Sequence, residues 1–102
     1  MSGIRPPKLD RVIHERARLL IMTYLASAQA KEIAFNELKN ELSMSAGNLS
    51  IQMRTLERSG LITIRKEFRG AKPFTGISLT AAGRRALKDY LAEMDMLLGA
   101  IR

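Results

Sequence analysis

The sequence predicts an α+β fold that is mainly α-helical, and three observations support this prediction. Apolar residues recur at helical spacing in four separate segments of the chain. A run of β-forming residues between positions 61 and 79 is interrupted by glycine and proline, as in a hairpin. The chain has 102 residues, of which 46% are hydrophobic, and this suffices for one domain with a modest core.

A basic N-terminal arm is expected over residues 1–9. Pro6 and Pro7 cannot continue a helix and hold the chain extended. Together with Arg5 and Lys8, this arm is either a contact to a nucleic acid or simply a mobile terminus.

The first helix is predicted over residues 10–28, where apolar and charged residues alternate at helical spacing. Its apolar stripe is wide, so we expect it to contact both the domain core and a partner subunit. The stripe consists of Ile13, Ala17, Leu20, Ile21, Tyr24 and Leu25.

Two further helices are predicted to form a helix-turn-helix. Residues 35–42 read as a short helix, and only two residues separate it from a second helix that Ser45 caps and Gly60 ends. In the second helix, the spacing of Leu49, Met53 and Leu56 predicts a buried stripe. The opposite face carries small, polar or cationic residues, namely Gly47, Ser50, Ile51, Arg54 and Arg58, with Asn48 and Thr55 on one flank.

Residues 61–68 and 74–79 are predicted to be two strands joined by the basic segment 69–73. A brief third strand is available at residues 33–35. A basic hairpin directly after the second helix of a helix-turn-helix is a wing. The predicted architecture is therefore a winged helix-turn-helix with a three-helix core, a small antiparallel β wing and a long C-terminal helix.

The final helix is predicted from the Thr80 cap to about residue 98, with heptad-like apolar spacing. It carries more apolar surface than one small domain can cover, so we expect it to pair with its copy in a homodimer; the alternative is that it only folds back over its own domain. The predicted interface consists of Leu87, Tyr90, Leu91, Met94, Leu97, Leu98 and Ile101.

The charge of the chain is concentrated where a nucleic acid would be contacted. The formal net charge is +7. If the charged residues were spread evenly along the chain, they would not mark any one surface as a binding site. Instead, residues 43–73 hold many bases and only Glu57 and Glu67 as acids. The bases in this segment are Arg54, Arg58, Arg65, Lys66, Arg69 and Lys72, of which we assign Arg65, Arg69 and Lys72 to DNA binding by the wing.

The sequence argues against catalytic and metal-binding functions. The chain has no cysteine, and its single histidine, His14, has neither a nucleophile nor enough candidate ligands around it, so we expect it to cap or pack. No phosphate-binding glycine loop or dinucleotide fingerprint is present. We therefore expect no enzyme, no cofactor and no metal. Since no apolar run is long enough for a bilayer, we also expect a soluble, cytoplasmic protein with no membrane partner.

Two segments together resemble a known group of regulators. They are Ser45-Ala-Gly-Asn-Leu-Ser, continued by Leu-Glu-x-x-Gly-Leu-Ile, and Leu79-Thr80-Ala-Ala-Gly-Arg. This pattern is similar to winged-helix transcriptional regulators of the MarR and ArsR type, especially their short single-domain relatives, and the likeness covers residues 10–98. The Cys and His clusters of metal-sensing ArsR proteins are missing here.

The resemblance implies a homodimer on a palindromic operator, with the second helix of the motif in the major groove and the wing tip at the minor groove. It matches Ser45, Asn48, Ser50, Gln52 and Arg54 to DNA-contacting positions of the family, and Arg69 and Lys72 to the wing tip. Whether a small-molecule effector exists is left open.

The functional hypothesis is sequence-specific binding of double-stranded DNA by a homodimer that acts as a transcriptional regulator, most simply a repressor. Residues 10–80 would form the DNA-binding domain and residues 81–102 a dimerisation helix packed on it. Two alternatives keep the fold: non-specific or architectural DNA binding, and a protein-interaction winged helix, for which the outward Ile51 is the one favourable residue.

Overall fold

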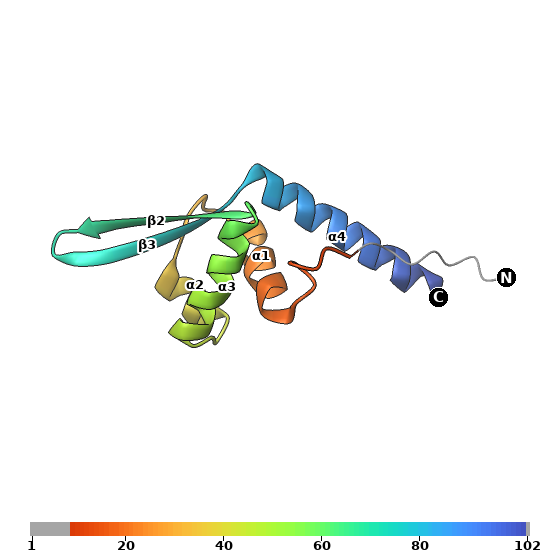
Figure 1. Ribbon diagram of the computed structural model, residues 1–102, viewed down its shortest axis with the longest axis horizontal. Coiled ribbons are helices and arrows are strands. Elements are labelled where there is room, and N and C mark those ends of the chain that lie inside the picture. The colour runs from red at the N-terminus through yellow and green to blue at the C-terminus, as the bar shows by residue number, and fades with distance from the viewer. Residues whose placement is uncertain (1–8, 102) are drawn as a thin grey trace.

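The computed structural model describes residues 9–101, so the basic part of the predicted arm, residues 1–8, lies outside the described residues. Leu9, which was assigned to the arm, packs against the hydrophobic core. The described chain folds as helices and one antiparallel sheet (Figure 1). In order, the elements are α1 (Arg16–Ser27), β1 (Ile33–Ala34), α2 (Phe35–Glu41), α3 (Ala46–Arg58), β2 (Ile62–Arg69), β3 (Lys72–Leu79) and α4 (Ala81–Ala100).

Helix α1 begins six residues later than predicted, because Asp10 organises a separate turn before it. The Asp10 Oδ1 atom accepts hydrogen bonds from the backbone N–H groups of Val12 and Ile13 at 2.8 and 3.3 Å. A short acidic side chain that binds nearby N–H groups competes with the helix. The helix starts only after Glu15, whose carboxylate accepts from the Arg18 N–H at 2.9 Å. Ile13 is fully buried, but from this turn and not from a helical stripe.

Helices α2 and α3 form the predicted helix-turn-helix. The chain reverses through Ser43, which adopts the left-handed conformation with φ of 52°. The Met44 N–H donates to the Lys39 carbonyl oxygen at 3.0 Å and closes the turn. Leu38 of α2 and the predicted stripe of α3 are buried in one core, which also receives side chains from α1, the sheet and α4.

The sheet has the strand order β1-β3-β2, so the predicted third strand is present and pairs with β3. Strands β2 and β3 form a hairpin, hereafter the wing, whose pairing continues to Arg69 opposite Lys72. Both strands are therefore longer at the tip than predicted. Gly70 has φ of 66°, and glycine with positive φ at the first loop position favours a two-residue turn over a longer loop.

Helix α4 is fixed to the domain at its first turns. The Thr80 Oγ1 atom accepts from the Gly83 N–H at 2.8 Å and donates to the Gly60 carbonyl oxygen at 2.7 Å, which joins the end of α3 to the start of α4. From there α4 runs away from the helical core, opposite to the wing, so that these two elements form the ends of an elongated molecule (Figure 1).

Two residues assigned to the dimer interface belong to the core of the chain itself. Leu87 and Tyr90 are 4% and 3% exposed, because α1 and the segment before it cover this part of α4. In this chain the two side chains therefore pack within the domain itself. Among residues 9–101, no helix is long and apolar enough to span a membrane.

Candidate nucleic-acid interface

Helix α3 presents one polar edge to solvent because its other edge is anchored in the core. Ser45 caps the helix, and its Oγ atom accepts from the Asn48 N–H at 3.1 Å. Leu49 and Leu56 are fully buried and Met53 nearly so, as predicted. On the opposite edge, Ser50 is half-buried and the other residues are exposed. The exposed residues are Gly47, Ile51, Arg54 and Arg58.

Gln52 lies on a different side of α3 from Arg54, next to α1. The Arg18 Nη1 atom donates to Gln52 Oε1 at 2.7 Å, and Gln52 Nε2 donates to Asn48 Oδ1 at 3.1 Å. Arg18 itself is held by the Val12 carbonyl oxygen, to which its Nε donates at 2.6 Å. Gln52 is therefore a tethered, half-buried link between α1 and Asn48, and not a free side chain on the outer edge.

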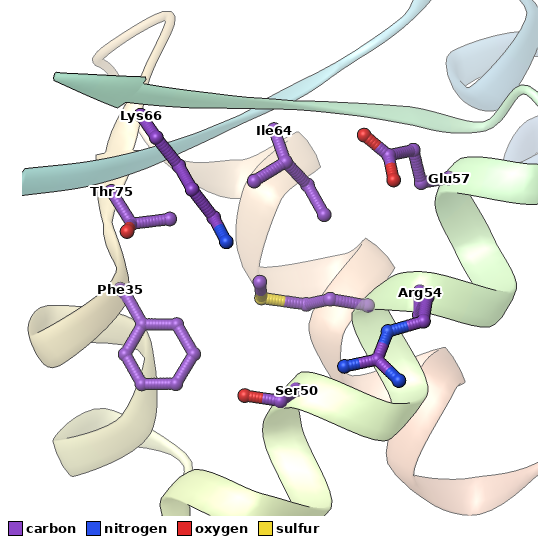
Figure 2. Close-up of a pocket in the computed structure, with 8 residues that line it drawn as sticks. Phe35, Ser50, Arg54, Glu57, Ile64, Lys66 and Thr75 are labelled. Carbon is purple, nitrogen blue, oxygen red and sulfur yellow. The ribbon is translucent and has the colours of Figure 1, made fainter.

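A groove of about 580 Å³ separates α3 from the wing. Figure 2 shows Lys66 and Ile64 extending from β2 toward α3, where Ser50 and Arg54 line the opposite wall. Met53 and Phe35 add apolar lining to the groove, and Figure 2 shows Phe35 and Glu57 toward opposite ends of it. The groove thus brings the cations Arg54 and Lys66 together with apolar side chains.

The strand register divides the wing into two faces. Side chains alternate along a strand, and residues directly opposite each other share a face. The face toward α3 therefore carries the pairs Ile64 with Ile77, Lys66 with Thr75, and Phe68 with Pro73. The far face carries the pairs Arg65 with Gly76, Glu67 with Phe74, and Arg69 with Lys72.

All three predicted wing residues lie on the far face, and two of them are already ion-paired. Arg65 makes a two-pronged contact with Glu32, at 2.8 Å from Nε and 2.7 Å from Nη2, and also binds Glu67. Arg69 binds Glu67 at 2.7 Å, and its guanidinium lies 3.5 Å from the centre of the Phe74 ring. The hydrogen bond from Arg65 lowers the pKa of Glu32, and those from Arg69 and Arg65 lower the pKa of Glu67.

This cluster, formed by Glu32, Arg65, Glu67, Arg69 and Phe74, ties the wing to the segment before β1. Gly76 makes room for it, because a Cβ atom there would lie 2.3 Å from the Glu32 side chain. The Glu32 side chain thus lies close against Gly76, and the pairing of β3 runs through this position without a bulge. Arg65 is thus a structural residue of the wing as much as a source of charge.

Sequence reasoning did not assign Lys66 and Phe68 to the interface, although both are exposed residues of β2 on the α3 side of the wing. The signal that could have found them is the alternation that starts at the buried Ile62 and passes through Ile64 to positions 66 and 68. Counting bases along the strand selected Arg65 and Arg69 instead, which lie on the opposite face.

His14 has a packing role, as predicted. Its Nδ1 atom is hydrogen-bonded to the Tyr90 hydroxyl at 2.7 Å, and the two rings are 5.7 Å apart. Within the described part of the chain, no group of three or more His, Cys, Asp or Glu residues could hold a metal ion.

Comparison with known proteins agrees with this geometry. Residues 17–98 match the family model of the winged helix DNA-binding domain. An uncharacterized protein of Methanocaldococcus jannaschii is 30% identical over 87 residues, which cover 85% of this chain and 92% of that protein.

Solved structures show the same fold. A transcriptional regulator homologue from Pyrococcus horikoshii OT3 superposes with a TM-score of 0.82 at 25% identity, and the match covers 90% of this chain and 89% of that one. A PadR family transcriptional regulator from Eggerthella lenta superposes with a TM-score of 0.69 at 25% identity, covering 84% of this chain and 80% of that one.

Proposed function

Because this chain belongs to the winged helix DNA-binding domain family, we propose that it binds DNA as a homodimer and reads a specific duplex sequence. Membership of this family makes the chain a DNA-binding regulator and not an enzyme. The prediction of a winged-helix domain of the kind found in transcriptional regulators is confirmed. The finer assignment to the MarR or ArsR type stays a prediction.

The observation that carries the proposal is the position of Arg54. It is exposed on the outer edge of α3, while Met53 beside it is 4% exposed and fixes the rotation of the helix. In a major groove, a guanidinium can donate to both acceptors of a guanine edge, which is worth about 1–3 kcal/mol of discrimination. Ile51, 59% exposed one turn earlier, can contact a thymine methyl group from the same edge.

Other residues of the interface are suited to the phosphate backbone. Ser45 and the free amides of the first turn of α3 lie at the positive end of the helix, where phosphate oxygens bind well. Arg58 is exposed at the far end of the same edge. Lys66 and Ser50 line the groove between α3 and the wing. We assign this groove to the backbone of the DNA strand that would pass between the two elements.

The homodimer is supported by the unpartnered stripe on the second half of α4. Leu91, Leu98 and Ile101 are 47%, 48% and 82% exposed, and Met94 and Leu97 lie between them on the same side. Such a stripe at heptad-like spacing is typical of a helix that packs on its copy. The two α3 helices would then read half-sites about one helical turn, roughly 34 Å, apart.

A dimer bound at a promoter would exclude polymerase from the same DNA, so we propose repression by occlusion. The check is transcription in vitro from a template that carries the preferred binding sequence upstream of or across the transcription start. This sequence is found by selecting bound duplexes from a random pool, as described below. Reduced transcription is expected, and increased transcription would contradict the proposal.

The test of sequence reading begins with selection of bound duplexes from a random pool. Affinity is then measured for the selected sequence and for a scrambled duplex at the same salt concentration. We expect a preference for the selected sequence that Arg54→Ala reduces by about tenfold or more.

Arg54→Lys is the matched control, because it keeps the charge and removes the two-pronged guanidinium. We expect it to bind the scrambled duplex like the wild type and to lose preference nearly as much as Arg54→Ala. If the wild type binds both duplexes equally, binding is non-specific and the proposal fails. If the wild type binds no duplex at low salt, the result favours the alternative in which this winged helix binds a protein.

A further inference from the structure

We propose that Phe68 and Pro73 form an apolar wedge at the tip of the wing that enters the minor groove of the bound DNA. This inference rests on the proposed DNA binding and adds residues that the charge pattern does not select. Phe68 is 75% exposed, although burial of such a ring is worth more than that of most side chains.

The wedge is a defined unit because its two residues are cross-strand partners. Phe68 and Pro73 lie directly opposite each other in the hairpin, and both are exposed. Cβ atoms of such pairs are about 5 Å apart, and the proline ring is rigid, so the two side chains form one compact apolar tip. Proline is tolerated at this point because β1 pairs only with Gly76 and Ile77, and leaves the outer half of β3 without a neighbour.

The wedge faces the side on which DNA is expected. Phe68 follows Lys66 and Ile64 on the face of the wing that lines the groove with α3. The sheet is three strands wide only as far as Gly76, which pairs with Ala34 of β1 and with Arg65 of β2. The four residues of β2 beyond Arg65 extend the two-stranded tip by about 13 Å at the usual strand rise. The hairpin can therefore leave the major-groove side and reach the neighbouring minor groove.

The charges around the wedge favour DNA over a protein partner. Lys66 precedes Phe68 on the same face, and Lys72 lies next to Pro73 at the turn. Within the described residues, neither lysine takes part in an ion pair, whereas the nearby Glu67 is neutralised by Arg65 and Arg69. An apolar centre between cations matches a minor groove, in which sugars and base edges lie between two rows of phosphates.

The test is the variant Phe68→Ala, compared with wild type on the selected duplex. We expect a loss of affinity of roughly tenfold. The slope of log affinity against log salt should stay the same, because no charge is removed. Hydroxyl-radical cleavage, which attacks sugars from the minor groove, should show that Phe68→Ala loses protection flanking each half-site and keeps the preference for the half-site itself.

Two further variants make the result specific. Phe68→Leu should keep most of the affinity, because a leucine can also fill the groove, and Met96→Ala, at another exposed apolar position, should bind like wild type. Unchanged affinity and protection for Phe68→Ala, or a change in its sedimentation mass, would overturn the wedge. Failure of the proposed function has a different signature, which is equal binding of selected and scrambled duplexes by the wild type.

Discussion

Arg54 and Gln52 are two positions apart on α3, yet their side chains have different tasks. Arg54 is exposed on the outer edge, whereas Gln52 accepts a hydrogen bond from Arg18 and donates one to Asn48. This second hydrogen bond occupies the carbonyl oxygen of the Asn48 amide and leaves its amino group free to donate outward. In the proposed complex with DNA, Gln52 and Arg18 would therefore act through Asn48, as positioning residues.

Another single contact joins α1 to α2 and makes the protein sensitive to alkaline pH. The Tyr24 hydroxyl donates to Glu37 Oε2 at 2.7 Å, and this hydrogen bond raises the pKa of Tyr24 to about 12. A tyrosine whose pKa is raised on folding stabilises the fold fully below its ordinary pKa of about 10. That contribution is lost as the pH rises from there through about 12.

We predict that one tyrosine, Tyr24, ionises near pH 12 in the folded wild type. The measurement is the difference between the ultraviolet titration curves of the wild type and of Tyr24→Phe. Glu37→Gln should return this ionisation toward the ordinary range, because the charged acceptor is gone. Circular dichroism at each pH verifies that the helices are still folded. Ionisation of Tyr24 near pH 10 in the folded wild type would contradict the assignment.

At the scale of elements, the Thr80 and Gly83 pair explains the Leu-Thr-x-x-Gly pattern in physical terms. Thr80 caps α4, and Gly83 lets the helix cross the start of β2 at very short range. A Cβ atom at Gly83 would lie 2.1 Å from the Leu61 carbonyl oxygen, which is backbone and cannot turn aside. We predict that Gly83→Ala destabilises the domain by about 1–3 kcal/mol, through overpacking.

Gly99, on the same helix, is the matched control, since a Cβ atom there would meet nothing within 4 Å. Gly99→Ala should leave the free energy of unfolding unchanged or raise it by up to about 1 kcal/mol, because alanine is the better helix former. Urea denaturation followed by circular dichroism measures both. Equal stability of the two variants would show that the crossing at Gly83 is not tight.

The elements that the sequence predicted well are those with a strong apolar period. The buried stripe of α3 and its Ser45 cap are local features, so spacing alone located them. The start of α1 was wrong because Asp10 binds backbone N–H groups that a helix pattern would use. Charge alone selects Arg65 as a DNA-binding residue of the wing, and only the register with β3 reveals that Arg65 and Glu32 meet across the sheet.

At the scale of the whole molecule, the wing and α4 project from opposite ends of the helical core, and each carries exposed apolar side chains (Figure 1). We predict that the α4 end holds two chains together. The double variant Leu91→Glu with Leu98→Glu should sediment at the mass of a single 11.4 kDa chain, because it places charge in the shared stripe. The wild type should sediment at twice that mass.

Met96→Glu is the control for this prediction. Met96 is 65% exposed on the opposite side of α4 from the stripe, so a charge there should leave the dimer intact. Dissociation by Met96→Glu alone, or a wild type that sediments as a monomer at micromolar concentration, would contradict the dimer. DNA affinity should fall with the double variant, because two half-sites are no longer bound together.

Sequence reading by α3 requires that Arg54 meets the DNA, and nitrogen-resolved NMR of the arginine Nε–H groups measures this directly. On titration with the selected duplex, we expect the Arg54 signal to shift strongly and to become protected from exchange with water. The Arg65 signal should change little, because Glu32 and Glu67 already hold its guanidinium. An Arg54 signal that stays at its free position while the duplex is bound would contradict the assignment of α3 as the reading element.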